Sequence, residues 1–273
     1  MKKLLLFIFL SLLAIDVTAQ WTWQSPLPQG NNLNSVRFTN SNTGFAVGYD
    51  GTIIKTINGG ADWTVLSSGI DNWLNSVFFT DDNTGYAVGD SGTIIRTLDG
   101  GATWNALSSG TISMLTSVFF TDANTGYVAG GNYLNNYSGT ILKTMNGGIT
   151  WTNLSGGLPF NIYLKSLYFT DANTGYAVGC HSGITNSYGT IIKTTNGGTT
   201  WTQLSFGSVD ILSSVYFTDA STGYVVGGSG TILKTTDAGT AWNNLSIGTN
   251  YFLSSVYFLD SAIGYIAGAN DTG

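Results

Sequence analysis

One segment of this chain occurs six times, and this repetition limits the fold more than any other feature of the sequence. The copy that begins at Leu74 reads LNSVFFTDDNTGYAVGDSGTIIRTLDGGATWNALSSG. Successive copies begin 41, 41, 49, 48 and 41 residues apart, at Leu33, Leu74, Leu115, Leu164, Leu212 and Leu253. Because one such unit cannot bury its own hydrophobic face, repeated units of this length stack on one another to form a common core.

Each unit contains four short runs of β-branched and aromatic residues, separated by Asn, Asp, Gly and Thr. These runs have the composition of β-strands and the separators have the composition of tight turns. Four strands in about 40 to 50 residues are typical of a β-propeller blade. A β-solenoid usually has shorter rungs, and a β-sandwich would not repeat its sequence so faithfully. The sequence therefore predicts an all-β chain, a β-propeller of four-stranded blades with five complete repeats and one split or incomplete blade.

The two ends of the repeat array are incomplete. Trp21-Thr22 resembles the start of a fourth strand without the three strands before it, and the last unit, from Leu253 to Gly273, contains only the first two strands. We expect these two pieces to share one blade within a propeller domain of residues 20–273. That blade would still lack a third strand, so the sequence is expected to be truncated at its C-terminus, with six or seven blades in the full protein.

The first 19 residues have the pattern of a secretory signal. Lys2 and Lys3 precede an apolar run over residues 4–13, and Val17-Thr18-Ala19 forms a small-residue cleavage site. The apolar run is shorter than the roughly 20 residues of a membrane helix, and no later run is long enough. We expect residues 1–19 to be cleaved and the protein to be secreted, at the cell surface or in the periplasm. Loss of Lys2, Lys3 and Asp16 leaves 7 basic and 14 acidic residues, a net charge of −7.

The join between the third and fourth runs of each unit carries the most specific motif. It reads Thr97-Leu98-Asp99-Gly100-Gly101-Ala102-Thr103-Trp104 in the second unit and resembles the Asp-box, or BNR repeat. Asn or Asp bonds the backbone of such a turn, Gly supplies positive φ, and Trp packs between blades. We therefore assign a structural role, rather than a catalytic or metal-binding one, to the following residues: Asn58, Trp63, Asp99, Trp104, Asn146, Trp151, Asn196, Trp201, Asp237 and Trp242.

The whole repeat, with its TDANTGYAVG turn and its GTIIKTTNGG strand, resembles the photosystem II assembly and stability factor family of β-propellers. The resemblance covers essentially all of residues 21–273. In that family the propeller is an assembly scaffold for a membrane complex. The resemblance therefore implies that this exported bacterial protein is a non-catalytic binding or assembly scaffold, with a protein or a glycan as partner.

The composition excludes several kinds of chemistry. All 15 acidic residues are Asp, and the chain has one His (His181), one Cys (Cys180) and two Arg (Arg37 and Arg96). This supply is too small for a zinc site, and the low charge disfavours nucleic acid. Sialidases with Asp-boxes need three Arg and a Glu, which this chain lacks. We expect no catalytic residue, no metal, no cofactor and a monomer. The alternative is an Asp-dependent glycoside hydrolase of the Asp-box type, with a non-repeating aspartate such as Asp210 as a weak candidate.

Three insertions distinguish the third and fourth units from the others. The connection between the second and third runs grows by six residues in unit three and by seven in unit four, and the link between these units gains two. Strand direction alternates within a blade, so all three insertions should emerge on one face of the propeller. Aromatic and amide side chains suit a peptide or sugar ligand, although surface insertions are also tolerated without a function. The candidate binding residues are Tyr133, Tyr137, Phe160, Tyr163, His181 and Tyr188.

One basic residue recurs at the same place in the third run of each complete unit. An anion could bind to such a ring of cations, but this run should lie away from the central axis. We expect each aliphatic stem to cover apolar surface while its charge pairs with a nearby Asp. The residues are Lys55, Arg96, Lys143, Lys193 and Lys234.

Overall fold

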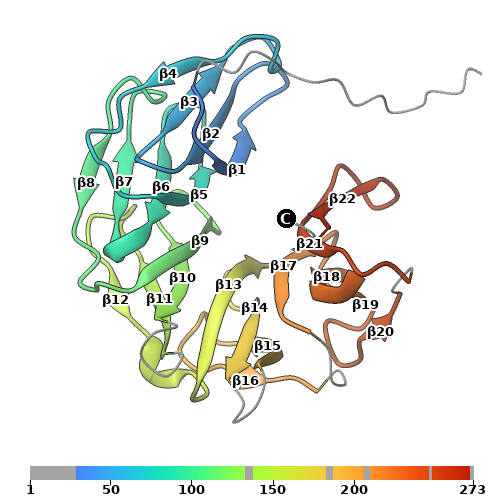
Figure 1. Ribbon diagram of the computed structural model, residues 1–273. Helices are drawn as coiled ribbons and strands as arrows, with labels where there is room; N and C mark the ends of the chain where they lie inside the picture. Colours follow the sequence, from blue (N-terminus) through green and yellow to red (C-terminus); the bar gives the residue numbers. More distant parts are fainter. Residues whose placement is uncertain (1–28, 133–137, 183–186, 206–209, 246–247, 271–273) are drawn as a thin grey trace, which may run out of the picture.

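The structure is a computed structural model that describes residues 29–132, 138–182, 187–205, 210–245 and 248–270. Its strands form six antiparallel sheets arranged around a central axis, so the predicted β-propeller of four-stranded blades is confirmed (Figure 1). Five sheets have four strands in chain order, and the sixth has two strands among the described residues. In every blade the first strand lies nearest the axis and the last one outermost.

Strand lengths repeat from blade to blade except in blades 3 and 4. Blade 1 contains β1 (Leu33–Phe38), β2 (Gly44–Gly48), β3 (Ile53–Thr56) and β4 (Thr64–Leu66). Blade 2 contains β5 (Leu74–Phe79), β6 (Gly85–Gly89), β7 (Ile94–Thr97) and β8 (Asn105–Leu107). Blade 3 contains β9 (Met114–Phe120), β10 (Gly126–Asn132), β11 (Ser138–Thr144) and β12 (Thr152–Asn153). Blade 4 contains β13 (Ile162–Phe169), β14 (Gly175–Ser182), β15 (Ser187–Thr194) and β16 (Thr202–Gln203).

The first three strands of blade 5 have the same lengths as those of blades 1 and 2, whereas the two strands of the sixth sheet are each one residue longer. Blade 5 contains β17 (Leu212–Phe217), β18 (Gly223–Gly227), β19 (Ile232–Thr235) and β20 (Asn243–Asn244). The sixth sheet contains β21 (Phe252–Phe258) and β22 (Gly264–Ala269). Three short 3-10 turns lie between strands, at Asp90–Gly92, Ser155–Gly157 and Gly228–Gly230.

The core lies between neighbouring blades, where three aromatic rings repeat in one arrangement. Phe79 of β5 stacks on Phe45 of β2 with ring centroids 4.1 Å apart, and the Trp104 ring meets Phe79 edge-on at 6.1 Å. The same stack recurs at the next four junctions with centroid distances of 3.8 to 4.3 Å. Edge-to-face and offset stacking are the favoured geometries of aromatic pairs. These pairs therefore stabilise each junction by more than the burial of their apolar area alone.

One junction stays open among the described residues. Val36 of β1 is 59% exposed and Phe38 is 42% exposed, whereas their counterparts Val77 and Phe79 in β5 are 5% and 6% exposed. On the other side of this junction, Ile266 of β22 is also exposed. The described strands therefore bury both faces of blades 2 to 5 but only one face of blade 1 and one of the sixth sheet.

The Asp-box turns are closed by their own side chains. In blade 2, the Asp99 carboxylate accepts the Thr97 hydroxyl at 2.8 Å and the Thr103 N–H at 2.8 Å. The Thr97 oxygen in turn accepts the Gly101 N–H at 2.9 Å, and both Gly100 and Gly101 have positive φ, of 64° and 85°. Because these polar atoms satisfy one another, the turn is a self-contained structural unit.

The recurrent basic residues of the third strands tie each blade to the next. The Lys193 ammonium donates to the Ala238 carbonyl in the following Asp-box turn at 2.8 Å, and it lies 5.4 Å from the centroid of the Tyr176 ring. Lys55, Arg96 and Lys143 make the equivalent bond, to Gly100, Gly147 and Gly197. The prediction that these cations pair with aspartates is wrong, because the turn carbonyl of the next blade lies within their reach.

The two faces of the propeller are built from different connections. On one face, each Asp-box turn bonds the turn between the first and second strands, as in Gly59 N–H to Asn42 O at 2.9 Å. We call this the Asp-box face. On the other face, the turn between the second and third strands bonds the link to the next blade, as in Gly51 N–H to Asn72 O at 3.0 Å. We call this the loop face, and it carries the insertions.

Candidate binding face

The insertions of blades 3 and 4 are extended hairpins. β10 and β11 pair as far as Asn132 with Ser138, and β14 and β15 pair as far as Ser182 with Ser187. In blade 2, by contrast, β6 and β7 are joined directly by the short turn Asp90–Gly92. The two long hairpins therefore project from the loop face on adjacent blades. Tyr133 and Tyr137, two of the predicted binding residues, lie outside the described residues.

Tyr163 is not a surface residue. Its side chain is 8% exposed, and its hydroxyl lies 2.9 Å from the sulfur of Met114 in the neighbouring blade. A Cβ built on Gly131 would lie 3.1 Å from the Tyr163 ring, so the ring packs against the backbone of the first long hairpin. The prediction that Tyr163 serves as a binding anchor is therefore corrected: it holds blades 3 and 4 together below the loop face.

His181, Tyr188 and Phe160 provide aromatic surface near the second hairpin. The His181 and Tyr188 rings face each other across β14 and β15 with centroids 4.9 Å apart, and Tyr188 is 40% exposed. Phe160, in the link to blade 4, is 90% exposed. The structure thus places these three predicted residues on blade 4 and on the link that leads into it.

Cys180 precedes His181 but has a different environment. The thiol is buried, and burial raises its pKa although the nearby Lys165 ammonium lowers it. A buried thiol of raised pKa is a poor nucleophile. The burial of Cys180 therefore argues against a nucleophile and base pair formed by Cys180 and His181.

A second aromatic surface lies on the loop face and was not predicted from the sequence. Tyr49, in the turn after β2, stacks on Trp73 with ring centroids 3.8 Å apart and planes within 4° of parallel. Trp73 lies directly before β5 and is 41% exposed. The available signal was that Trp73 stands outside the Asp-box positions that the other tryptophans of the repeats occupy.

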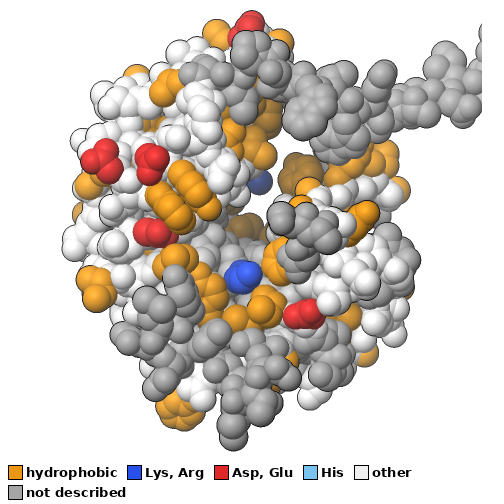
Figure 2. Space-filling model, viewed as in Figure 1, with side chains coloured by type: hydrophobic (Ala, Val, Ile, Leu, Met, Phe, Trp, Pro, Cys, Tyr) orange, Lys and Arg blue, Asp and Glu red, His pale blue; other side chains and the backbone are white. Residues whose placement is uncertain are grey.

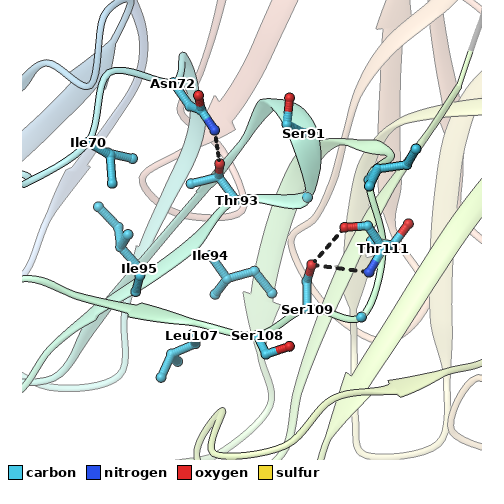
Figure 3. A pocket seen from close by; sticks show the side chains of 14 residues that line it. Ile70, Asn72, Ser91, Thr93, Ile94, Ile95, Leu107, Ser108, Ser109 and Thr111 are labelled. Carbon is cyan, nitrogen blue, oxygen red and sulfur yellow. Dashed lines mark hydrogen bonds between the residues drawn. The ribbon is translucent and has the colours of Figure 1, made fainter.

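A groove of about 810 Å³ lies beside this stack on blade 2 (Figure 3). Its polar groups bond each other: Asn72 donates to Thr93 Oγ1 at 2.7 Å, and the Ser109 hydroxyl donates to Thr111 O at 3.2 Å. Blade 1 repeats both bonds, from Asn31 to Thr52 and from Ser68 to Ile70. Because these two bonds recur in another blade, the groove arises from the repeated structure and is not a feature of blade 2 alone.

Comparison with known proteins identifies the family. The family model described as Photosynthesis system II assembly factor YCF48 matches residues 14–108, 61–202, 156–250 and 199–271, which together extend from residue 14 to residue 271. The chain belongs to this family. No curated protein matches the sequence.

Solved structures of the YCF48 family share this fold. The structure "YCF48 bound to D1 peptide" has a TM-score of 0.51 and 17% identity, with 89% of this chain and 92% of that chain covered. YCF48 from Cyanidioschyzon merolae has a TM-score of 0.58 and 18% identity, with 89% and 94% covered. The GH74 enzyme of Niastella koreensis has a TM-score of 0.62 and 19% identity over 84% of this chain, but the match covers 41% of that enzyme.

The YCF48-like fold supports a binding or assembly scaffold rather than an enzyme. Five aspartates hold the turns between first and second strands, because the carboxylates of Asp81, Asp122, Asp171, Asp219 and Asp260 each accept two backbone N–H groups. Asp210, the weak hydrolase candidate, accepts the Ser229 hydroxyl at 2.7 Å and the Ile211 N–H at 2.8 Å. These bonds give Asp210 a structural role in blade 5.

No group of three His, Cys, Asp or Glu side chains in the described part of the chain could hold a metal ion. Within the same residues, no helix is long and apolar enough to cross a membrane.

Proposed function

We propose that this protein is an exported, non-catalytic scaffold of the YCF48 family that binds an extended segment of a protein partner on its loop face. The observation that carries the proposal is the pair of long hairpins, which project from adjacent blades while the corresponding turns of blades 1, 2 and 5 stay short. A YCF48 structure described as bound to D1 peptide supports a protein partner over a glycan.

The exposed side chains near the hairpins fit this role. Tyr188 and Phe160 present aromatic surface with few rotatable bonds, so they lose little conformational entropy when a ligand covers them. His181 holds the Tyr188 ring from the side by stacking. The unpaired backbone of an extended peptide could also bond to amide and hydroxyl side chains, which this chain has in abundance.

The test removes the hairpins and keeps the propeller. Residues 131–138 and 180–188 are each replaced by Asp-Ser, which stands between Gly89 and Gly92 in blade 2. Peptides selected from a random display library on the wild-type protein are then measured on both proteins by calorimetry. We expect binding to fall at least tenfold in the trimmed protein, while its thermal unfolding stays cooperative.

The matched control alters exposed apolar residues on the opposite face. Leu98→Ser and Met145→Ser change side chains that are 60% and 74% exposed beside Asp-box turns. We expect these variants to bind the selected peptides as the wild type does. Equal binding by the trimmed protein would place the site elsewhere on the molecule and overturn the proposal.

The glycoside hydrolase alternative is tested with the same protein. A panel of polysaccharides is incubated with it, and both retention and release of reducing ends are measured. We expect no release. Release that disappears on Asp210→Asn, or on substitution of another aspartate outside the repeated turns, would replace the scaffold by an enzyme.

The proposal also includes export of the protein, directed by residues 1–19. The charge and hydropathy pattern of residues 1–19 supports it. The test fuses residues 1–24 to a reporter that is active only outside the bacterial cytoplasm. An inactive fusion, with a functional signal peptide as the positive control, would contradict export.

A further inference from the structure

Arg37 and Lys165 are basic residues at first-strand positions where the counterparts in the other blades are uncharged, and neither has a hydrogen-bond acceptor among the described residues. Of the third-strand cations, four donate to a turn carbonyl of the next blade, and Lys234, which has no described acceptor, lies over the Tyr224 ring at 5.3 Å. Arg37 of β1 lies over the Phe78 ring at 4.9 Å, and Lys165 of β13 lies over the Phe252 ring at 5.1 Å. Both belong to first strands, which line the central opening.

Lys165 departs from a hydrogen bond that links each of blades 1, 2 and 3 to the next blade. At its position in the first strand, Asn34, Asn75 and Thr116 donate to the leucine carbonyl of the next blade at 2.8 to 3.0 Å. The ammonium group of Lys165 instead lies over a ring of the sixth sheet, two blades further on. This half-buried cation therefore reaches across the opening, and burial lowers its pKa.

Arg37 begins a series of side chains, one from each blade, that runs around the axis. The same position in successive first strands is aromatic, and neighbouring rings lie 5.0 to 5.4 Å apart from blade 2 to the sixth sheet. We call these residues the aromatic girdle: Phe78, Phe119, Tyr168, Tyr216 and Tyr257. Four of the five are half-buried, so parts of their rings face the opening.

The charge of Arg37 acts across the opening. Burial raises the pKa of Tyr168 to about 12, and Arg37 opposes that rise although it belongs to blade 1 and Tyr168 to blade 4. Figure 2 shows basic side chains inside the central opening, with hydrophobic side chains around it and acidic ones on the surrounding blades. Two basic residues, Arg37 and Lys165, thus lie at the axis of a protein whose net charge is −6.

We propose that the central channel binds an organic anion with an aromatic or otherwise apolar body, its acidic groups pairing with Arg37 and Lys165 and its body packing against the aromatic girdle. Positive charges within low-dielectric walls strengthen their attraction for an anion, and unpaired cations can gain charge-assisted hydrogen bonds. The two cations lie three residues apart along their strands, which corresponds to at most about 10 Å along the channel at roughly 3.3 Å per residue, because a bulge at Lys165 shortens the spacing. A ligand with two separated acidic groups therefore fits better than one with a single acidic group.

The probe for this site is biphenyl-4,4′-dicarboxylate, measured by calorimetry at low and at moderate salt. Its comparison compounds are biphenyl-4-carboxylate and the neutral biphenyl-4,4′-dimethanol, which keeps the body and removes the charge. We expect affinity to decrease in that order, with the diol at least tenfold weaker than the dicarboxylate. No measurable binding of either carboxylate, or equal binding of the diol, would overturn the proposal.

The variants are Arg37→Gln and Lys165→Met, with Lys234→Met as the control that removes the same charge outside the channel. A hydrogen bond to a charged group contributes about 1.5 to 3 kcal/mol, so each channel variant should lose about tenfold or more. The control should stay within about twofold, and an equal loss there would show a general charge effect and overturn the site. Arg37→Lys keeps the charge, and its affinity should fall between those of the wild type and Arg37→Gln. This site is independent of the hairpins, so the peptide experiment can fail without affecting it.

Discussion

The Asp-box face and the loop face are made by the same repeat, yet their polar and aromatic groups are used differently. On the Asp-box face, the side chains of Thr97 and Asp99 form hydrogen bonds within their own turn. On the loop face, turn length varies and rings such as Trp73 and Tyr188 stay partly exposed. The comparison teaches that the most specific sequence motif marks structure, whereas the departures from the repeat mark the candidate binding surface.

The strongest test of the structural role is Trp201→Ala. Trp201 is 6% exposed, meets Phe169 edge-on at 6.1 Å, and donates from Nε1 to Gly198 O at 3.1 Å. Removal of a buried aromatic side chain costs about 3 to 5 kcal/mol, which we expect as the loss in free energy of unfolding. Urea denaturation measures it. Trp151→Ala serves as the comparison: that ring is only half-buried, so its loss should be smaller. A cost below 1 kcal/mol at Trp201 would contradict the packing.

The contact between blades is tested by Lys193→Met. The variant keeps an aliphatic stem over the Tyr176 ring and removes the bond to Ala238 O, so we expect a loss of about 1 to 2 kcal/mol in the free energy of unfolding. Lys234→Met is the matched control, because no described turn accepts a bond from Lys234. If both variants lose the same stability, the bond across the junction contributes nothing.

Acid sensitivity should come from the Asp-box face. The N–H of Thr103, with further bonds from the Thr103 and Thr97 hydroxyls, lowers the pKa of Asp99 to about 2. A carboxylate with a pKa below its unfolded value of about 3.9 stabilises the fold above that value and loses this contribution as the pH falls through the folded value. Backbone N–H bonds also lower the pKa of Asp122, Asp171 and Asp219. Stability should therefore fall between about pH 4 and pH 2.

Asp99→Asn tests how much a single aspartate contributes to the loss of stability at low pH. Asn146 and Asn196 occupy the same position in blades 3 and 4 and accept the equivalent N–H at 2.9 and 3.0 Å. We expect little change in stability at pH 7 and a shallower loss below pH 4, measured by thermal unfolding across the pH range. Parallel acid curves for the variant and the wild type would contradict the assignment.

The smallest effect on stability is expected at Phe160. The side chain is 90% exposed, so Phe160→Ser should change the free energy of unfolding by less than about 0.5 kcal/mol. On the proposed function, the same variant weakens the binding of peptides selected on the wild type. Unchanged peptide affinity would remove Phe160 from the binding surface without affecting the fold.

The fold could be predicted from the sequence because a propeller is built from local and repeated information. Each blade is a set of antiparallel strands joined by short turns, and the turn chemistry of residues such as Asp99 and Gly101 lies within a few positions of the strands that it joins. The repeat of about 41 residues then requires neighbouring blades to pack in the same way each time. Fold class, strand order and the face that carries the insertions followed from these patterns.

The tertiary structure decided what the side chains do between blades. Tyr163 resembles a surface aromatic in the sequence, but the extended hairpin of blade 3 covers its ring. The third-strand cations find carbonyls 45 to 54 residues away, which no local pattern indicates. The arrangement of the blades around an axis brings the first strands together, and with them Arg37, Lys165 and the aromatic girdle. The distances between these side chains therefore depend on the angle between blades and not on their separation in the chain.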